Sequence, residues 1–246
     1  MPKRMYRSFQ ALLLLALCLF FAGKAANGQL TYYINLRFVP LTIFGMVFLA
    51  VLAQNLFSEL RRTRGSAEES EHDHYDKPAA ANLWFMLVPL AIGILIPTRP
   101  LDSSAFATKG FNTTGPLVSS DSSAQLIETE SQDRNVLDWL KIFNYETDLT
   151  PYLGQRSSVI GFVYRDDQLS ENQFYVSRFV ITCCAADGFA IAMVAESPEA
   201  ASFKQDAWVL VKGPVSSITL NDRPVPLIKA ESVQAVSVPE QPYLFP

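Results

Sequence analysis

Apolar residues gather in the first hundred positions, in three runs over residues 11–23, 38–57 and 79–97. The second run holds twenty residues without a formal charge, which is the length of a helix that crosses a bilayer. The third is almost as long and contains Pro89, which a membrane helix tolerates, usually with a kink. The pattern predicts three transmembrane helices, over about 9–26, 38–57 and 79–97.

The first run permits two interpretations. Its basic start, its short apolar stretch and the small residues Gly23, Ala25 and Ala26 are typical of a secretory signal. Lys24 interrupts these small residues, however, and another apolar run follows closely. We therefore favour a retained first helix, and a cleaved signal remains the alternative.

Basic residues orient the predicted helices. Two clusters flank the first two runs: Lys3, Arg4 and Arg7 before the first, and Arg61, Arg62 and Arg64 after the second. Because basic residues concentrate in cytoplasmic loops, both clusters belong on the cytoplasmic side. The prediction is a protein of the cell (inner or plasma) membrane with a cytoplasmic N-terminus, a cytoplasmic loop over 58–78 and an extracytoplasmic C-terminal domain.

Both histidines of the chain lie in this cytoplasmic loop. His72 and His74 alternate with the acidic residues Glu71 and Asp73, and Asp76 follows. Imidazoles with flanking carboxylates can bind a transition metal. The alternative is a solvated, charged loop without a specific ligand. We favour the alternative because the run holds only two histidines and no cysteine.

The chain changes character after the third apolar run. Residues 99–130 are rich in Ser, Thr, Asp and Gly, which predicts a linker. Residues 131–143 place apolar side chains at helical spacing, with Ser131 as a candidate cap and Asp133 in the first turn. A short amphipathic helix is therefore expected to lead a domain over 131–246.

The rest of this domain is predicted to be all-β. Short β-rich runs are separated by turn residues, over 158–164, 174–182, 189–195, 208–212 and 215–220, with one or two more in 225–238. This spacing favours a small antiparallel barrel or sandwich. Gly161 and Gly213 suit the bends of a five-stranded, OB-like barrel. Such a fold alone assigns no function.

Composition narrows the classes of function. The chain is 49% hydrophobic and 18% charged, and its net charge of −4 averages two unlike halves. Residues 1–98 carry 9 Lys and Arg against 6 Asp and Glu, whereas residues 99–246 carry 11 against 18. The apolar excess excludes a simple soluble enzyme, and the acidic half argues against nucleic acid as a partner. Residues 99–246 contain no histidine, so no Ser-His-Asp triad or zinc–histidine site can form there.

Cys183 and Cys184 are the most conspicuous chemical feature of the predicted β-domain. Neighbouring Cα atoms lie about 3.8 Å apart, below the usual separation in a disulfide, so a bond between them would be strained. Three interpretations stay open: small core residues, a redox-active pair, or ligands of a soft metal or metalloid together with Asp187. Arg178 and Asp187 are also candidates for an ion pair across the hairpin.

The stretch RFVITCCAADGFAIAMV, followed by WVLVKG and the terminal PEQPYLF, resembles the YcgQ-like family of bacterial membrane permease subunits. The resemblance extends to YLGQRSSVIGFVY and to GQLTYYINLRFVPLT before the second apolar run. It implies a non-enzymatic accessory subunit whose partners are the lipid bilayer and a separate multi-span permease. The outer β-domain would gate or collect the substrate, a metal or metalloid ion being one candidate. The alternative is an extracytoplasmic thiol-redox protein that acts through Cys183 and Cys184.

Overall fold

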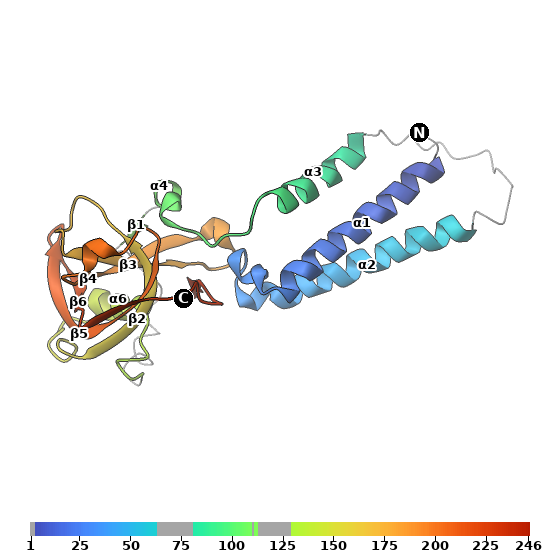
Figure 1. Cartoon of the computed structure of the whole chain (residues 1–246). Helices are drawn as coiled ribbons and strands as arrows, with labels where there is room; N and C mark the ends of the chain where they lie inside the picture. The colour runs from blue at the N-terminus through green and yellow to red at the C-terminus, as the bar shows by residue number, and fades with distance from the viewer. Residues whose placement is uncertain (1–2, 63–80, 110, 113–128) are drawn as a thin grey trace. The chain divides into compact units, whose positions relative to one another are not determined.

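The computed structural model describes residues 3–62, 81–109, 111–112 and 129–246, which separate into two units (Figure 1). A helical unit comprises Met1–Leu30 and Leu36–Arg99. A sheet unit comprises Pro100–Pro246 together with Thr31–Asn35, a short stretch between the first two helices that we call the connector. The connector is therefore separated in sequence from the rest of the unit to which it belongs.

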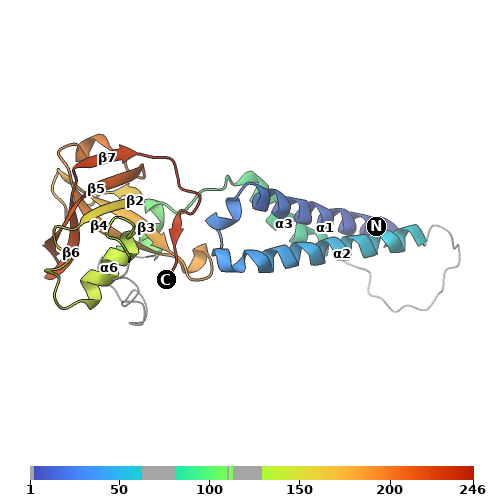
Figure 2. The same cartoon turned by 90° about the horizontal axis from the view of Figure 1, so that it is seen from below.

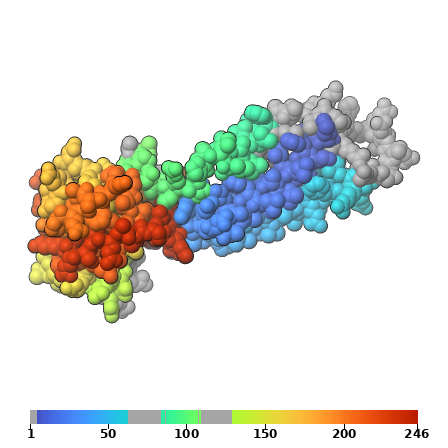
Figure 3. Space-filling model, viewed as in Figure 1, coloured from blue at the N-terminus to red at the C-terminus, as the bar shows by residue number. Residues whose placement is uncertain are grey.

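Three helices build the helical unit: α1 (Lys3–Ala26), α2 (Val39–Arg62) and α3 (Ala81–Leu95). Figure 3 shows α1 between the other two. The Cys18 thiol of α1 donates a hydrogen bond of 3.5 Å to the carbonyl of Met46 in α2. On the other side, a Cβ added at Gly93 of α3 would lie 2.8 Å from the Phe20 ring. Small and apolar groups thus bring the three helices together.

Two helices of the described chain are long and apolar enough to cross a membrane, over Met5–Ala26 and Leu36–Arg62. The sequence predicted three. The third forms a helix, but α3 has only 15 described residues. At 1.5 Å per residue it rises about 22 Å, less than the roughly 30 Å of a hydrocarbon core. It ends at Leu95, just before Pro97, which has no N–H to continue the helix.

The strands of the sheet unit pair mainly with near neighbours in sequence. Their bounds are β1 (Phe111–Asn112), β2 (Arg156–Tyr164), β3 (Gln173–Val180), β4 (Phe189–Glu196), β5 (Trp208–Leu220), β6 (Arg223–Lys229), β7 (Ser232–Ala235) and β8 (Tyr243–Leu244). Strand β2 pairs with β3 and β5, β3 with β4, β4 with β6, and β6 with β5. These five pairings connect β2, β3, β4, β6 and β5 in a closed cycle. All are antiparallel except β4–β6.

Three short strands add to this cycle. Strand β1 pairs with β4 and β8 with β3, both in parallel, and β7 pairs with β5 in antiparallel orientation. Short helical turns occupy the connections: η1 (Gln29–Tyr32), η2 (Leu36–Phe38), η3 (Ser103–Ala105), α4 (Phe106–Lys109), η5 (Ala185–Asp187) and η6 (Ala200–Ser202).

Strand β5 differs from its prediction. The sequence suggested two strands separated by a turn at Gly213 and Pro214, but one strand of 13 residues runs through both. A Cβ at Gly213 would overlap the carbonyl oxygen of Lys229, so only glycine lets β6 approach so closely. Gly161 of β2 is comparable, because a Cβ there would lie 2.7 Å from the carbonyl oxygen of Ser177. Both glycines permit close approach of two backbones.

Helix α6 (Val136–Tyr145) lies against the strands (Figure 2). The predicted cap, Ser131, is wrong. Asn135 caps the helix, accepting from the amides of Leu137 and Asp138, while Asp138 accepts in return from the amide of Asn135. This reciprocal arrangement satisfies N–H groups that a helix start leaves without partners.

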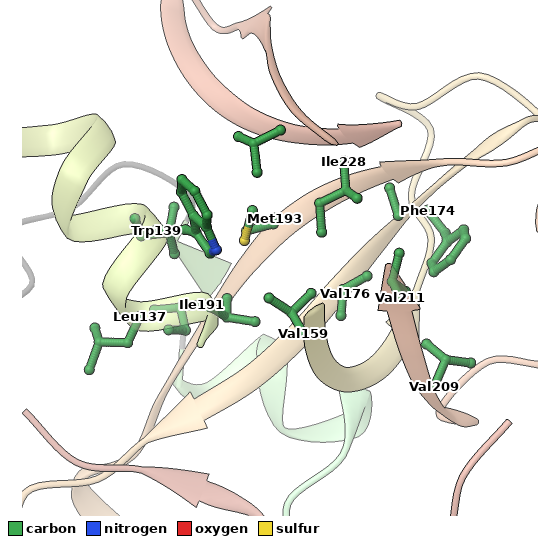
Figure 4. Packing of buried hydrophobic residues seen from close by; sticks show 14 of the residues in the cluster. Leu137, Trp139, Val159, Phe174, Val176, Ile191, Met193, Val209, Val211 and Ile228 are labelled. Atoms are coloured by element: carbon green, nitrogen blue, oxygen red, sulfur yellow. The ribbon is translucent and has the colours of Figure 1, made fainter. Parts of the chain in front are cut away.

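The apolar face of α6 covers the main core of the sheet unit. Trp139 is fully buried, in one cluster with Ile191 and Met193 of β4 (Figure 4). A second cluster contains Phe106, whose ring lies 5.8 Å from that of Phe162. Phe106 falls inside the segment that the sequence suggested was a linker. The polar composition of the segment concealed this buried aromatic residue.

Candidate functional site

The cysteine pair lies in the loop between β3 and β4, residues 181–188, which we call the thiol loop. Both cysteines are free, with Cys183 exposed and Cys184 half-buried. Their Sγ atoms lie 3.7 Å apart. Among the three interpretations of the pair, a role as core residues is therefore wrong for Cys183. The loop presents two neighbouring thiols at the surface of the sheet unit.

Asp187 fixes the backbone beneath the thiols. Its carboxylate accepts hydrogen bonds from the amide of Thr182 at 3.1 Å and from the amide of Cys183 at 2.7 Å. Partial burial raises the pKa of Asp187, but the hydrogen bonds from Cys183 and its neighbours outweigh it and hold that pKa below its ordinary value. Asp187 thus acts as an ionised clamp on the loop.

The same carboxylate acts on the thiol. The side-chain hydrogen bond to Asp187, followed by the one to Cys184, raises the pKa of Cys183 to about 11. A neighbouring negative charge disfavours the thiolate. Cys183 is therefore a protonated thiol at neutral pH and not an activated nucleophile.

The connector pairs with the thiol loop. The amide of Asn35 donates to the carbonyl of Cys183 at 3.0 Å, and the amide of Ala185 donates to the carbonyl of Tyr33 at 2.7 Å. Ile34 and Cys184 lie opposite each other in this antiparallel bridge. The buried Asn35 adds a side-chain hydrogen bond of 2.9 Å to the carbonyl of Thr182. The residues between the two membrane-length helices are thus hydrogen-bonded to the backbone of the cysteine pair.

Arg178 does not form the predicted ion pair with Asp187. Its guanidinium is buried and donates to the carbonyls of Pro242 at 3.0 Å, Ile160 at 3.2 Å and Gln241 at 2.7 Å. Burial lowers the pKa of Arg178 to about 10. Arg178 points into the sheet unit because three carbonyls there replace the water that it loses. It holds the C-terminal segment in place.

Tyr243 joins three distant segments of the sheet unit. Its hydroxyl donates to the carbonyl of Tyr32 in the connector at 3.1 Å and accepts from the amide of Leu101 at 2.8 Å. Burial raises the pKa of Tyr243 to about 12. Neither this tyrosine nor the connector was predicted from the sequence to contribute to the site. A tyrosine beside apolar residues near the C-terminus indicates a buried hydroxyl that needs a hydrogen-bond partner. The sequence does not show which residues those partners are.

The remaining candidate ligands are the two histidines. His72 and His74 lie outside the described residues. Within the described ranges, no group of three or more His, Cys, Asp and Glu side chains is arranged to hold a metal ion. The thiol loop itself brings the two sulfurs together, while Asp187 accepts hydrogen bonds from the amides of Thr182 and Cys183.

These features define a class of protein: a chain with two helices of membrane-spanning length and a C-terminal sheet unit that also incorporates their connector. Residues 9–112 match the DUF1980 N-terminal domain, and residues 112–246 match the DUF1980 C-terminal domain. The second match alone covers more than half of the chain. The chain belongs to the DUF1980 family.

Two curated relatives extend over most of the chain. It is 27% identical to "UPF0703 protein YcgQ" of Bacillus subtilis (strain 168), over 96% of this chain and 99% of the relative. It is 21% identical to the "Putative two-component membrane permease complex subunit" of Streptococcus mutans serotype c, over 89% of this chain and 92% of the relative. The resemblance to the YcgQ-like family is confirmed.

One solved structure also resembles part of the chain. This is a small single-stranded DNA-binding protein from Streptomyces coelicolor, 13% identical, covering 33% of this chain and 91% of its own, with a TM-score of 0.23. A likeness this weak carries no argument about fold or ligand.

Proposed function

We propose that this chain is a non-enzymatic accessory subunit of a membrane permease. Its helices bind the multi-span permease within the bilayer, and its sheet unit gates or collects the substrate outside. The observation that carries the proposal is the apolar surface of α2: Leu41, Phe44 and Phe48 are 65%, 69% and 56% exposed. These residues lie on one helix face, at spacings of three and four. Lipid or a second membrane protein must cover such a face.

The connector supports a third membrane crossing. It lies between α1 and α2, yet it belongs to the same unit as Pro100–Pro246. If α2 crosses the bilayer, the chain after Arg62 is on the side opposite to the connector. It must then cross again before Pro100 to rejoin the sheet unit. Helix α3 lies in this part of the chain and would belong to that crossing.

The same reasoning orients the protein. The basic clusters at both outer ends of α1 and α2 favour the cytoplasm, so the connector is extracytoplasmic and the sheet unit is on its side. Residues 131–246 then form an outer domain on a membrane region of residues 1–98. The five-strand pairing cycle, with one parallel pair, supports an OB-like barrel for this domain.

Nothing observed favours the thiol-redox alternative. The cysteines are adjacent and lack the C-x-x-C spacing, and the neighbouring Asp187 keeps Cys183 protonated. The name of the S. mutans relative likewise describes a permease complex subunit.

Co-purification from mild detergent tests the proposed function. The tagged wild-type chain should retain a multi-span membrane protein in stoichiometric amount. Phe44→Ala combined with Phe48→Ala should reduce the retained amount several-fold. The matched control is Leu12→Ala with Leu19→Ala, which removes similarly exposed side chains from α1. If the α2 double variant loses the permease and the α1 double variant retains it, the contact lies on α2. If the wild type retains no multi-span protein, the accessory-subunit proposal is wrong.

Thiol labelling tests the topology. In a variant lacking Cys18, Cys183 and Cys184, single cysteines are introduced by Ser66→Cys and Ser237→Cys; Ser237 is exposed in the sheet unit. A maleimide that cannot cross membranes should label position 237 in intact cells and position 66 only after permeabilisation. Labelling of both positions from one side would refute the third crossing.

A further inference from the structure

We propose that Cys183 and Cys184 form a two-thiol binding site for a trivalent metalloid compound, and that the connector senses its occupancy. The inference deepens the proposed function and rests on it for its biological use, because it names the class of substrate that the outer domain would collect. The binding itself is a property of this chain alone.

The geometry suits one bridging atom. The two Sγ atoms are 3.7 Å apart, well beyond the roughly 2.05 Å of a disulfide bond. An atom bonded to both sulfurs at about 2.3 Å, a length typical of zinc–sulfur bonds, would subtend a nearly tetrahedral angle. Cys183 is exposed, so the ligand has access from solvent.

The number of donors selects the ligand class. A structural zinc site takes four protein ligands, whereas the described residues of the loop offer two sulfurs. We count the two sulfurs alone, because no group of three or more His, Cys, Asp and Glu side chains in the described residues is arranged to hold a metal ion. Two thiols match a trivalent metalloid that keeps one substituent of its own. The soft sulfur atoms also prefer such an ion to hard cations.

The reaction needs no oxidant or reductant. With phenylarsine oxide as the probe, two As–S bonds form and the arsenic–oxygen bonding is lost. The two thiol protons leave with the oxygen as one water molecule. Arsenic stays trivalent and retains its phenyl group, so atoms and electrons balance.

The backbone contacts provide the link to the connector. The carbonyl of Cys183 accepts from Asn35, and Cys184 lies opposite Ile34 in the bridge. Closing a ring through both sulfurs fixes the two cysteine side chains and stiffens the peptide between them. The connector amides bonded to this segment should then open less often.

The test uses the purified full-length chain in detergent, in a Cys18→Ser background and without a permease. We expect one phenylarsine oxide bound per chain and slower hydrogen exchange at the amides of Asn35 and Ala185. Cys183→Ser and Cys184→Ser, each alone, should weaken binding about hundredfold or more, because the second bond is intramolecular only when both thiols are present. Circular dichroism confirms that these variants fold.

Three outcomes would overturn the proposal: single variants that bind as tightly as the parent, exchange rates at Asn35 and Ala185 that do not change, or stoichiometric binding of Zn²⁺ alone that blocks the arsenical. Each outcome is independent of permease capture. The two-thiol site and the accessory-subunit role can therefore fail separately.

Discussion

The helical and sheet units use apolar residues in opposite ways. In α2 the large apolar side chains are mostly exposed, as Leu41 and Phe44 illustrate, and Ala53 is buried. In the sheet unit, Trp139, Phe174 and Met193 are fully buried. The sheet unit closes its own core, whereas the helical unit needs a surrounding that the chain does not provide. High hydrophobic content therefore means an exposed apolar surface in one unit and a packed core in the other.

The largest expected difference between the two units is the effect on stability of replacing a large apolar side chain by alanine. Trp139→Ala leaves a cavity between α6 and the strands and should lower the free energy of unfolding of the sheet unit by about 3–5 kcal/mol. Phe44→Ala removes an exposed ring and should leave that free energy unchanged. Denaturant titration, followed by far-ultraviolet circular dichroism in detergent, measures both. Equal losses would contradict the division into a self-closed and an uncovered unit.

A glycine substitution sharpens the account of the sheet. Gly213→Ala places a Cβ against the Lys229 carbonyl, where rigid backbone leaves no room. We expect a loss of about 1–3 kcal/mol, as in other overpacked sites. The control is Gly45→Ala in α2, where a Cβ meets nothing within 4 Å. A thermal melt that finds the two variants equally stable would refute close backbone approach as the reason for Gly213.

The thiol loop gives a prediction about pH. The hydrogen bond to Asp187 is the largest of the causes that raise the pKa of Cys183 to about 11, so Asp187→Asn should lower that pKa and increase the thiolate fraction at pH 8. In a Cys18→Ser, Cys184→Ser background, alkylation by iodoacetamide should accelerate about threefold for each unit by which the pKa falls, because the larger thiolate fraction is partly offset by the lower nucleophilicity of a less basic thiolate. Rates measured from pH 7 to 11 test this, and an unchanged profile would remove Asp187 as the cause.

The smallest effect is expected at an exposed ion pair. Arg156 and Glu231 form hydrogen bonds of 2.8 and 3.1 Å, but their side chains are 63% and 49% exposed. Glu231→Gln should cost no more than about 1 kcal/mol, and less in high salt. A larger, salt-independent loss in a urea titration would show that more than the surface pair depends on Glu231.

Local patterns predicted much of the architecture. The uncharged run over 38–57 identified α2, which extends to Arg62, and the β-rich runs identified β2, β3 and β4. The helix cap was predicted at Ser131 and lies at Asn135, which the aspartate three residues later could have indicated. The sequence predicted a turn at Gly213 and Pro214, where one strand continues, because glycine followed by proline is typical of turns.

The surroundings of the candidate site could not be predicted in this way. Asn35 and Thr182 are hydrogen-bonded across 147 positions of sequence, and Tyr243 and Tyr32 across 211. No local periodicity reports such contacts. Arg178 similarly looked like the partner of a nearby aspartate, whereas its partners are carbonyls of the C-terminal segment. The cysteines could be identified from the sequence, but the contact of the connector with their loop could not.

The proposed function requires the exposed face of the helical unit to bind a permease. A photo-crosslinking amino acid at Phe44, with a second variant at buried Trp139 as control, tests it most directly in intact membranes. Irradiation should crosslink position 44, and not position 139, to one multi-span membrane protein. Crosslinks from position 44 to lipid alone, or only to another copy of this chain, would contradict it.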